Sequence, residues 1–160
     1  MIIREINRED DKRLAQIIRR AFETHDLVIP GTAYFDPELD HLSKYYEQDT
    51  DNRSYFVMTE DDGTLVGGVG FSRIDGFEDC VEMQKLYLDD SVKGRGYGRQ
   101  LVEYLEKVAL DMGFKQMYLE THSNLAVAIA MYKKMGFELI EKPEFVVHGA
   151  MDHFFLKQLL

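Results

Sequence analysis

The sequence predicts a mixed α/β fold, with helices on both faces of one central sheet. Three observations point to it: strand-like runs in both halves of the chain, helical apolar periodicity between them, and a strand–helix–strand succession over residues 81–121. A helical crossover of this kind joins parallel strands, whereas hairpins are antiparallel. The expected order is β-α-α-β-β-β-α-β-α-β-β, in a single domain that spans residues 1–160.

The N-terminal third begins with a strand and continues with two helices. "IIREI" alternates like a short strand, and after it apolar residues recur at helical spacing as far as Phe22. Asp10 or Asp11 is placed to cap this first helix. "FDPELDHLSKYYE" predicts a second helix, with Asp36 as its N-cap and Pro37 at the first helical position.

The rest of the chain alternates strands with two longer helices. "SYFVMTE" and "LVGGVGFSRI" predict two strands joined by the turn "DDGT", and "VEMQKLYL" predicts a third. The helix that follows has apolar residues at helical spacing as far as Met112, and Gly113 ends it. "FKQMYLET" predicts a strand, and a helix from about Leu125 to Met135 ends at Gly136. "FELIEK" and "AMDHFFLKQL" predict the last two strands.

Composition excludes several classes of protein. The apolar fraction of 45% and the charged fraction of 30% are ordinary for a soluble globular protein of 160 residues. No run of about 18 apolar residues occurs, so neither a membrane-spanning helix nor a membrane partner is expected. The N-terminus lacks the pattern of a signal peptide, and the single cysteine, Cys80, can form no internal disulfide. We therefore expect a cytoplasmic protein.

The net charge further limits the classes of binding partner that are expected. A net charge of -10 argues against general nucleic-acid binding, whose affinity depends on cationic contacts with phosphates. Acidity of this size serves solubility, or else it suits a cationic or amine-bearing partner. A metal site is not expected, because the histidines show no spacing such as H-E-x-x-H. The histidines are His25, His41, His122, His148 and His153.

The stretch "VKGRGYGR" concentrates glycine and positive charge at a strand-to-helix turn. Its glycines, Gly94, Gly96 and Gly98, stand at every second position. Glycine lets the backbone turn tightly and approach a ligand, and the first amides of a helix have no partner within it. With the helix dipole, these features predict an anion site suited to phosphate. The cations that add charge are Lys93, Arg95 and Arg99.

This turn matches none of the common nucleotide-binding loops. The string G-x-x-x-x-G-K-[ST] does not occur in the chain. The dinucleotide pattern G-x-G-x-x-G fails because, counting from Gly94 and Gly96, the third glycine would fall at Arg99. A glycine-rich connector with incidental basic residues is the plain structural alternative.

Two motifs resemble the GNAT superfamily of N-acetyltransferases. "VKGRGYGRQLVEYL" resembles its coenzyme A pyrophosphate motif, R/Q-x-x-G-x-G/A, with Lys93, Gly96 and Gly98 at the three defined positions. "NLAVAIAMYKKMGFE" resembles its second signature helix, and the order of elements between the two motifs also matches. The resemblance implies a GNAT-like acyl-CoA N-acyltransferase fold and direct acetyl transfer from acetyl-CoA to a primary amine of a small molecule or protein. A non-catalytic acyl-CoA-binding or regulatory domain is the alternative.

The resemblance also implies a catalytic carboxylate and a tyrosine. Glu82 matches the strand position where many family members carry the base, acting directly or through water; the alternative is an exposed glutamate or a salt-bridge partner. Simple alternation places Glu82 on one face with Gln84, Leu86 and Leu88, unless a bulge, common in this strand of the family, intervenes. Tyr132 matches the tyrosine near the CoA sulfur, placed there as general acid; otherwise it packs on an apolar helix face.

Further cofactor contacts follow from the same resemblance. The backbone of Leu86, Tyr87 and Leu88 is implied to bind the pantetheine arm, with one amide there stabilising the oxyanion. Asn124 is implied to contact CoA, or else it caps the helix that follows. The implied residues of the glycine-rich loop are Lys93, Gly94, Arg95, Gly96, Tyr97, Gly98 and Arg99.

The acceptor side is implied to lie between the N-terminal helices, where "LVIPGTAYFDPEL" falls. Tyr34 is expected to stack on the acceptor or bond to it, and Asp36 to pair with its ammonium group. The alternatives are core packing for Tyr34 and helix capping for Asp36. Dimers are frequent in the resembling family, so a homodimer is a further expectation.

Overall fold

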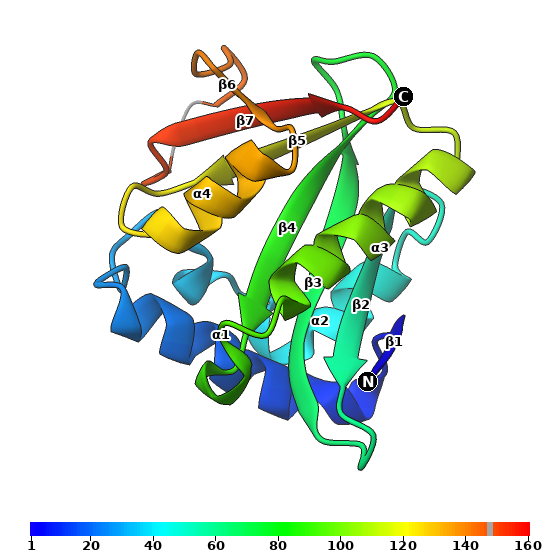
Figure 1. Cartoon of the computed structure of the whole chain (residues 1–160), viewed down its shortest axis with the longest axis vertical. Helices are drawn as coiled ribbons and strands as arrows, with labels where there is room; N and C mark the ends of the chain where they lie inside the picture. The colour runs from blue at the N-terminus through cyan, green and yellow to red at the C-terminus, as the bar shows by residue number, and fades with distance from the viewer. Residues whose placement is uncertain (147–148) are drawn as a thin grey trace.

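The computed structural model describes residues 1–146 and 149–160, and its central feature is a seven-stranded sheet (Figure 1). The strands lie in the order β1-β2-β3-β4-β5-β7-β6. Only β4 and β5 pair in parallel among the described strands; every other neighbouring pair is antiparallel. The bounds are β1 Ile2–Glu5, β2 Arg53–Thr59, β3 Leu65–Ile74, β4 Cys80–Leu88, β5 Gln116–Thr121, β6 Glu138–Ile140 and β7 His153–Gln158. The predicted mixed α/β fold and its order of elements are confirmed.

The helices cover both faces of this sheet (Figure 1). They are α1 Asp11–Thr24, α2 Leu42–Glu47, α3 Tyr97–Asp111 and α4 Ala126–Lys134. Short 3₁₀ turns occur at Arg8–Asp10, Ala33–Phe35, Leu39–His41 and Asp90–Val92. None of the described helices has both the length and the apolar character needed to cross a membrane.

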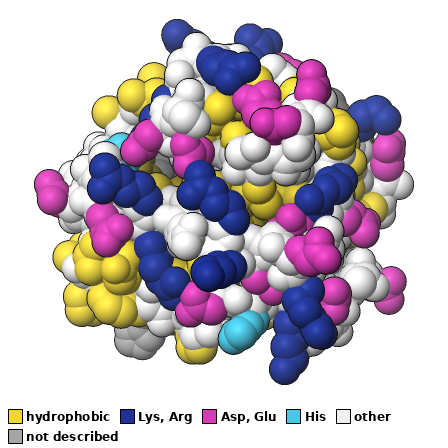
Figure 2. Space-filling view, turned by 90° about the horizontal axis from the view of Figure 1, so that it is seen from below, with side chains coloured by type: hydrophobic (Ala, Val, Ile, Leu, Met, Phe, Trp, Pro, Cys, Tyr) yellow, Lys and Arg dark blue, Asp and Glu magenta, His cyan; other side chains and the backbone are white. Residues whose placement is uncertain are grey.

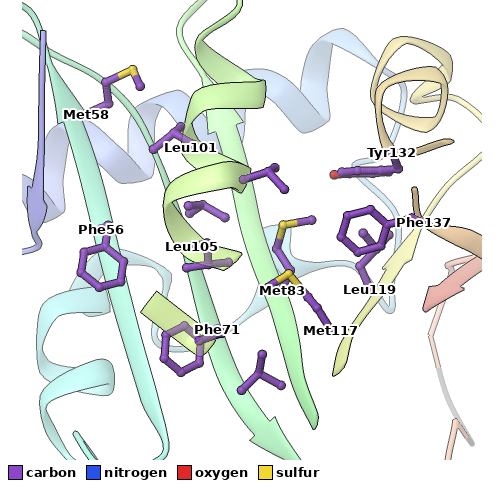
Figure 3. Packing of buried hydrophobic residues seen from close by; sticks show 14 of the residues in the cluster. Phe56, Met58, Phe71, Met83, Leu101, Leu105, Met117, Leu119, Tyr132 and Phe137 are labelled. Atoms are coloured by element: carbon purple, nitrogen blue, oxygen red, sulfur yellow. The ribbon is translucent and has the colours of Figure 1, made fainter. Parts of the chain in front are cut away.

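Each face of the sheet has its own apolar core. On one face Leu101 and Leu105 of α3 are fully buried, and Figure 3 shows them over Phe71 and Met83 of the sheet. On the other face Leu14 and other residues of α1 pack with α2 and with the opposite side chains of β2. Because each fully buried leucine contributes roughly 1.5–3 kcal/mol, both helical layers are firmly held against the sheet.

The second helix begins later than the sequence predicts. Asp36 does not cap it; the chain instead makes two 3₁₀ turns, and α2 begins at Leu42. Asp11, which is buried in α1, accepts hydrogen bonds from the Ser43 amide at 2.9 Å and from the Ser43 Oγ at 2.7 Å. A carboxylate from another helix thus accepts a hydrogen bond from a backbone amide in the first turn of α2. Asp10 occupies the N-cap position of α1, but its side chain makes no capping bond to that helix.

A bulge interrupts β4 at Lys85. The register against β3 shifts between Gly68 and Gly70, and Lys85 adopts a φ of 53°. An extra residue on one strand of a pair turns the strand and changes which side chains share a face. Strict alternation along β4 therefore ends at this residue.

The side chains beyond the bulge occupy different faces from those predicted. Tyr87 packs against Phe22 of α1, with the ring centroids 5.4 Å apart, on the face that also carries Glu82 and Gln84. Leu86 and Leu88 pack instead against the core beneath α3 and α4. Simple alternation therefore fails beyond Lys85, and Leu86 and Leu88 do not share the face of Glu82; the bulge named as the exception to alternation is present.

The two parallel strands separate soon after they pair. Residues Cys80–Glu82 of β4 lie opposite Gln116–Tyr118 of β5, yet β4 continues to Leu88. Figure 1 shows the strands diverging beyond this short contact. Within the described ranges, the part of β4 after Glu82 pairs with β3 alone. Its other edge is left with backbone groups available to a ligand.

Candidate active site

The glycine-rich loop leads from β4 into α3. Gly94 and Gly96 adopt φ values of 80° and 79°, in the left-handed region that favours glycine, and Gly96 is the N-cap of α3. The backbone amides of Gly94, Gly96 and Gly98 donate no hydrogen bond to a loop or side-chain acceptor among the described residues. Free donors at the positive end of a helix dipole form an arrangement suited to phosphate.

Gly98 has a different role from the other two glycines. A Cβ atom at this position would lie 3.4 Å from the Met131 Sδ and 3.5 Å from the Leu88 Cδ1. Gly98 therefore stands where α3, α4 and the end of β4 converge.

Each cation of the loop has a carboxylate partner. The pairs are Lys93 with Asp90 at 2.7 Å, Arg95 with Glu60 at 2.9 Å and Arg99 with Glu103 at 2.7 Å. Figure 2 shows Lys and Arg side chains interspersed with Asp and Glu over this end of the molecule. Because exposed ion pairs contribute little to stability, these cations can exchange partners at small cost.

Two arginines of α1 also reach the approach to the loop, and sequence reasoning missed them. Arg13 pairs with Asp89, and the Arg20 Nε lies 3.6 Å from the Asp90 Oδ2. Both line a cleft of about 180 Å³ between α1 and the end of β4. No local pattern signals this proximity, because Arg13 and Asp89 are 76 residues apart in the sequence.

Glu82 lies at the last β4 position that pairs with β5, opposite Tyr118. The Gln84 Nε2 donates a hydrogen bond to the Glu82 Oε1 at 2.9 Å. Burial raises the pKa of the Glu82 carboxyl; the Gln84 hydrogen bond opposes this, and the charge of Glu120 adds to it. No cation of the described residues lies within ion-pair distance of Glu82. It is therefore neither freely exposed nor a salt-bridge partner, which were the alternatives to a base.

Tyr132 is a core residue of α4. Its ring packs against Phe137 and Phe155, with centroids 5.7 Å and 6.1 Å apart. In Figure 3 the hydroxyl points away from α4, toward the side of the cluster where α3 and β4 lie. The hydroxyl has no hydrogen-bond partner among the described residues, and the residue is 6% exposed. Burial raises the pKa of Tyr132, so the phenol is protonated at neutral pH.

Asn124 does not cap α4. Leu125 is the N-cap residue of this helix, and its own side chain makes no capping bond. The Asn124 Nδ2 instead donates to the His25 carbonyl at 3.0 Å, which links the β5–α4 connection to the end of α1. The capping alternative is wrong, and the cofactor contact stays a prediction.

The two residues predicted on the acceptor side both have protein partners. The Tyr34 ring packs against Phe22 and Phe35 at centroid distances of 6.3 Å and 5.1 Å. Asp36 lies 3.0 Å from the Lys85 Nζ, whose side chain is only 10% exposed. An acceptor ammonium that approaches Asp36 would therefore compete with Lys85.

The face that carries Glu82 holds further polar groups that sequence reasoning missed. The Tyr46 Oη donates to the Gln84 Oε1 at 2.8 Å, and the Tyr118 Oη donates to the Glu120 Oε2 at 2.8 Å. Alternation along β4 did place Gln84 beside Glu82, but nothing in the sequence connects either residue with Tyr46. Glu120 could be found only from the pairing of β4 with β5.

No group of three metal-ligating side chains converges within residues 1–146 and 149–160. His148, one of the histidines considered for metal binding, lies outside the described residues.

Comparisons with known proteins agree with this geometry. Residues 13–137 match the family model described as the acetyltransferase (GNAT) family. The uncharacterised N-acetyltransferase YjgM of Escherichia coli (strain K12) is 35% identical over 142 residues, which cover 88% of this chain and 83% of that protein.

Solved structures share the fold at low sequence identity. The structure of a GNAT-family acetyltransferase from Staphylococcus aureus Mu50 has a TM-score of 0.85 at 18% identity and covers 99% of both chains. The PaiA N-acetyltransferase of Thermoplasma acidophilum, in complex with coenzyme A, has a TM-score of 0.78 at 19% identity over 98% of both chains. Together with the family model and the E. coli relative, these matches show that the chain belongs to the GNAT family of acetyltransferases and is an N-acetyltransferase.

Proposed function

We propose that this protein transfers the acetyl group of acetyl-CoA directly to a primary amine of a small molecule or protein. The observation that carries the proposal is the arrangement of Glu82, Tyr132 and the glycine-rich loop around the place where β4 and β5 diverge. One group can accept a proton, one can donate a hydrogen bond, and one can bind phosphate. These are the three tasks of acetyl transfer from a CoA thioester.

In this proposal the loop and the free edge of β4 hold the cofactor. The amides of Gly94, Gly96 and Gly98 bind the pyrophosphate, and Lys93, Arg95 and Arg99 supply charge at the rim. The backbone of Leu86–Leu88, which pairs with β3 alone within the described ranges, binds the pantetheine arm. One amide of this segment stabilises the oxyanion that forms on the thioester carbonyl. Asn124, on the β5–α4 connection, is an additional contact in this proposal.

Glu82 removes the proton that blocks attack. A primary amine has a pKa near 10, so it is protonated at neutral pH and carries no free electron pair. Glu82, directly or through a water molecule, takes one proton from the ammonium group. The freed nitrogen then forms a bond to the carbonyl carbon. As the tetrahedral intermediate collapses, the C–S bond breaks and the nitrogen loses its second proton, which the departing thiolate takes up, so the products are the N-acetyl amide and the CoA thiol. The raised pKa of Glu82 makes it a stronger base than an exposed glutamate.

Tyr132 stabilises the departing sulfur. Its phenol is protonated at neutral pH and has no competing partner among the described residues. An ordinary thiol has a pKa near 8.5, below that of this phenol, so complete proton transfer to the thiolate is uphill. The hydrogen bond from Tyr132 to the sulfur is therefore its larger contribution.

The test is an assay of CoA release with acetyl-CoA and a panel of amines. The panel includes small monoamines, polyamines, peptides with a free N-terminus, and N-terminally blocked peptides that contain lysine. Turnover on some members and not others supports the proposal and separates a small-molecule acceptor from a protein one. Tight acetyl-CoA binding, measured by calorimetry, without turnover on any amine would instead support a non-catalytic acyl-CoA-binding or regulatory domain.

A further inference from the structure

We propose that Tyr46 and Gln84 form a hydrogen-bonded chain that orients the Glu82 carboxylate toward the acceptor amine, so that both act as positioning residues. This inference rests on the proposed function, in which Glu82 is the base. It adds two residues from different elements to the acceptor side of the reaction.

The chain runs in one direction. The Tyr46 Oη donates to the Gln84 Oε1 at 2.8 Å, and the Gln84 Nε2 donates to the Glu82 Oε1 at 2.9 Å. An ionised carboxylate only accepts hydrogen bonds, so it requires the NH₂ group of Gln84 on its side. The amide oxygen must then face Tyr46, whose hydroxyl is the donor that completes the chain. The carboxylate of Glu82 thus determines the orientation of the Gln84 amide, and that orientation requires a donor at Tyr46.

Glycine on the neighbouring strand makes room for the chain. Gly70 lies opposite Gln84 in the β3–β4 register, and a Cβ atom on it would be 3.1 Å from the Tyr46 Cζ. The same atom would lie 2.5 Å from the Tyr55 ring, which packs 5.2 Å from Tyr46. Because Gly70 has no side chain, the ring of Tyr46 can cross β3 and reach β4.

A second tyrosine holds the adjacent point of β4. The Tyr55 Oη donates to the carbonyl of Lys85 at 2.7 Å, at the bulge that follows Gln84. Tyr46 therefore holds a side chain of β4 and Tyr55 holds its backbone. Both rings are buried, so the polar chain is anchored in a closely packed layer and not on a mobile surface.

This arrangement leaves one oxygen of Glu82 free. Gln84 occupies the Oε1, whereas the Oε2 accepts no hydrogen bond from the described residues. We therefore assign the Oε2 as the atom that receives the proton. A hydrogen bond to the Oε1 also favours the ionised form, which is the form that a base needs.

Other ionisable groups face the same carboxylate, and they must be held constant in a test. They are Glu120 and Tyr118 from β5, Lys85 and Cys80 from β4, and Tyr46 itself from α2. Burial raises the pKa of Tyr46 well above its ordinary value. This hydroxyl therefore remains a donor over the working pH range, and its own titration does not enter the profile.

The first experiment measures the titration of Glu82 by carbon-detected NMR of the side-chain carboxyl, assigned with Glu82→Gln. In Gln84→Met the midpoint should rise, because the carboxylate loses the bond that favours its charge. In Tyr46→Phe it should rise by less, since Gln84 keeps its amide but loses its orientation. The double variant should match Gln84→Met alone, because Tyr46 acts only through Gln84.

Tyr45→Phe is the matched control, because it removes one hydroxyl from the neighbouring residue of α2, whose ring contacts Arg53 instead. Its Glu82 midpoint should equal that of the unaltered protein. An unmoved midpoint in Gln84→Met, or an equal rise in Tyr45→Phe and Tyr46→Phe, would overturn the proposal. Tyr46→Phe keeps the buried ring, so the test stands even if Gln84→Met folds poorly.

The second experiment measures kcat/KM against pH with an amine identified in the acceptor panel. In Gln84→Met the acidic limb should move to higher pH with the Glu82 midpoint, and kcat/KM on that limb should fall on the order of tenfold. A Glu82 midpoint that moves without the acidic limb would remove the chain from catalysis. Failure of the proposed function is distinguishable, because it would appear as no turnover in the unaltered protein while the NMR result still holds.

Discussion

The proposed cofactor side and the proposed acceptor side of this molecule are built by different means. On the proposed cofactor side, neighbouring residues supply backbone donors: Gly94, Gly96 and Gly98 lie in one turn at the start of α3. On the proposed acceptor side, Glu82 accepts a hydrogen bond from Gln84, which accepts one from Tyr46, 38 residues earlier in the chain. The first site is local backbone, and the second is a tertiary assembly of side chains.

The difference explains what a sequence can reveal about each side. A backbone site requires glycine at particular positions, which leaves a visible pattern. A side-chain site can be assembled from any elements that the fold brings together, so its members carry no spacing. The same contrast predicts that variants on the acceptor side change the rate and its pH dependence, whereas loop variants change the affinity for acetyl-CoA.

Glu82→Gln should have the largest effect. We expect kcat to fall on the order of 100-fold near neutral pH, because the ammonium loses its base. The loss should shrink as the pH approaches the amine pKa of about 10, where the amine is already free. CoA release measured across this range is the test, with Glu138→Gln on the exposed strand β6 as control. A loss that is the same at every pH would exclude Glu82 as the base.

Tyr132→Phe should lower kcat about tenfold and leave the KM for acetyl-CoA nearly unchanged, because only the donor to the leaving sulfur is removed. The ring contacts with Phe137 and Phe155 remain, so the thermal midpoint should not fall. Steady-state kinetics with thermal melts separate the two effects. A lower midpoint together with unchanged kcat would show that Tyr132 serves packing alone.

Gly96→Ala should raise the KM for acetyl-CoA about fivefold. A non-glycine residue at a φ of 79° costs about 1–2 kcal/mol, and relief of that strain would displace the amides. Gly63→Ala is the matched control: its φ is 90°, and like Gly96 it has no atom within 4 Å of an added Cβ. Both variants should lose similar stability in denaturant melts. An equal rise in KM for both would locate the effect in general stability and not in the loop.

Arg95→Gln should raise the KM for acetyl-CoA only two- to fourfold, because the amides remain and an exposed charge contributes about 0.2–1 kcal/mol. The rise should diminish at high salt, where such charges are screened. Lys107→Gln, which breaks an exposed pair with Asp111 on the same helix, is the control and should leave the KM unchanged. An effect of Arg95→Gln as large as that of Gly96→Ala would mean that side chains, not amides, dominate phosphate binding.

The smallest effect should be that of Glu82→Gln on stability. Burial raises the folded-state pKa of Glu82 above its unfolded value, so the folded state holds more protons between the two values. The contribution of Glu82 to the free energy of unfolding therefore falls as the pH rises between these two pKa values. At neutral pH the carboxylate is charged and buried, and its burial lowers the stability of the folded state. Glu82→Gln should raise the thermal midpoint slightly at neutral pH and not at about pH 4, below the unfolded pKa. A larger gain at low pH would contradict this account.

Several features could be predicted from the chain because they depend on neighbours in sequence. Apolar periodicity located α1, α3 and α4, and the glycines of "VKGRGYGR" marked the turn into α3. The order of strands and helices and the family were both confirmed. Local patterns suffice here because a helix face, a turn and a backbone anion site are each made by residues within a few positions of one another.

Other features were decided only when the chain folded. Asp36 carries the local signature of a helix cap, yet Asp11 from another helix satisfies α2, and Asp36 pairs with Lys85. The bulge at Lys85 reversed the faces of Leu86 and Leu88. By itself the sequence determined the order of the elements and the glycine-rich turn into α3. The environment of Glu82 was decided by the tertiary structure, because burial and hydrogen bonding at that carboxylate come from strands and helices that are distant in the chain.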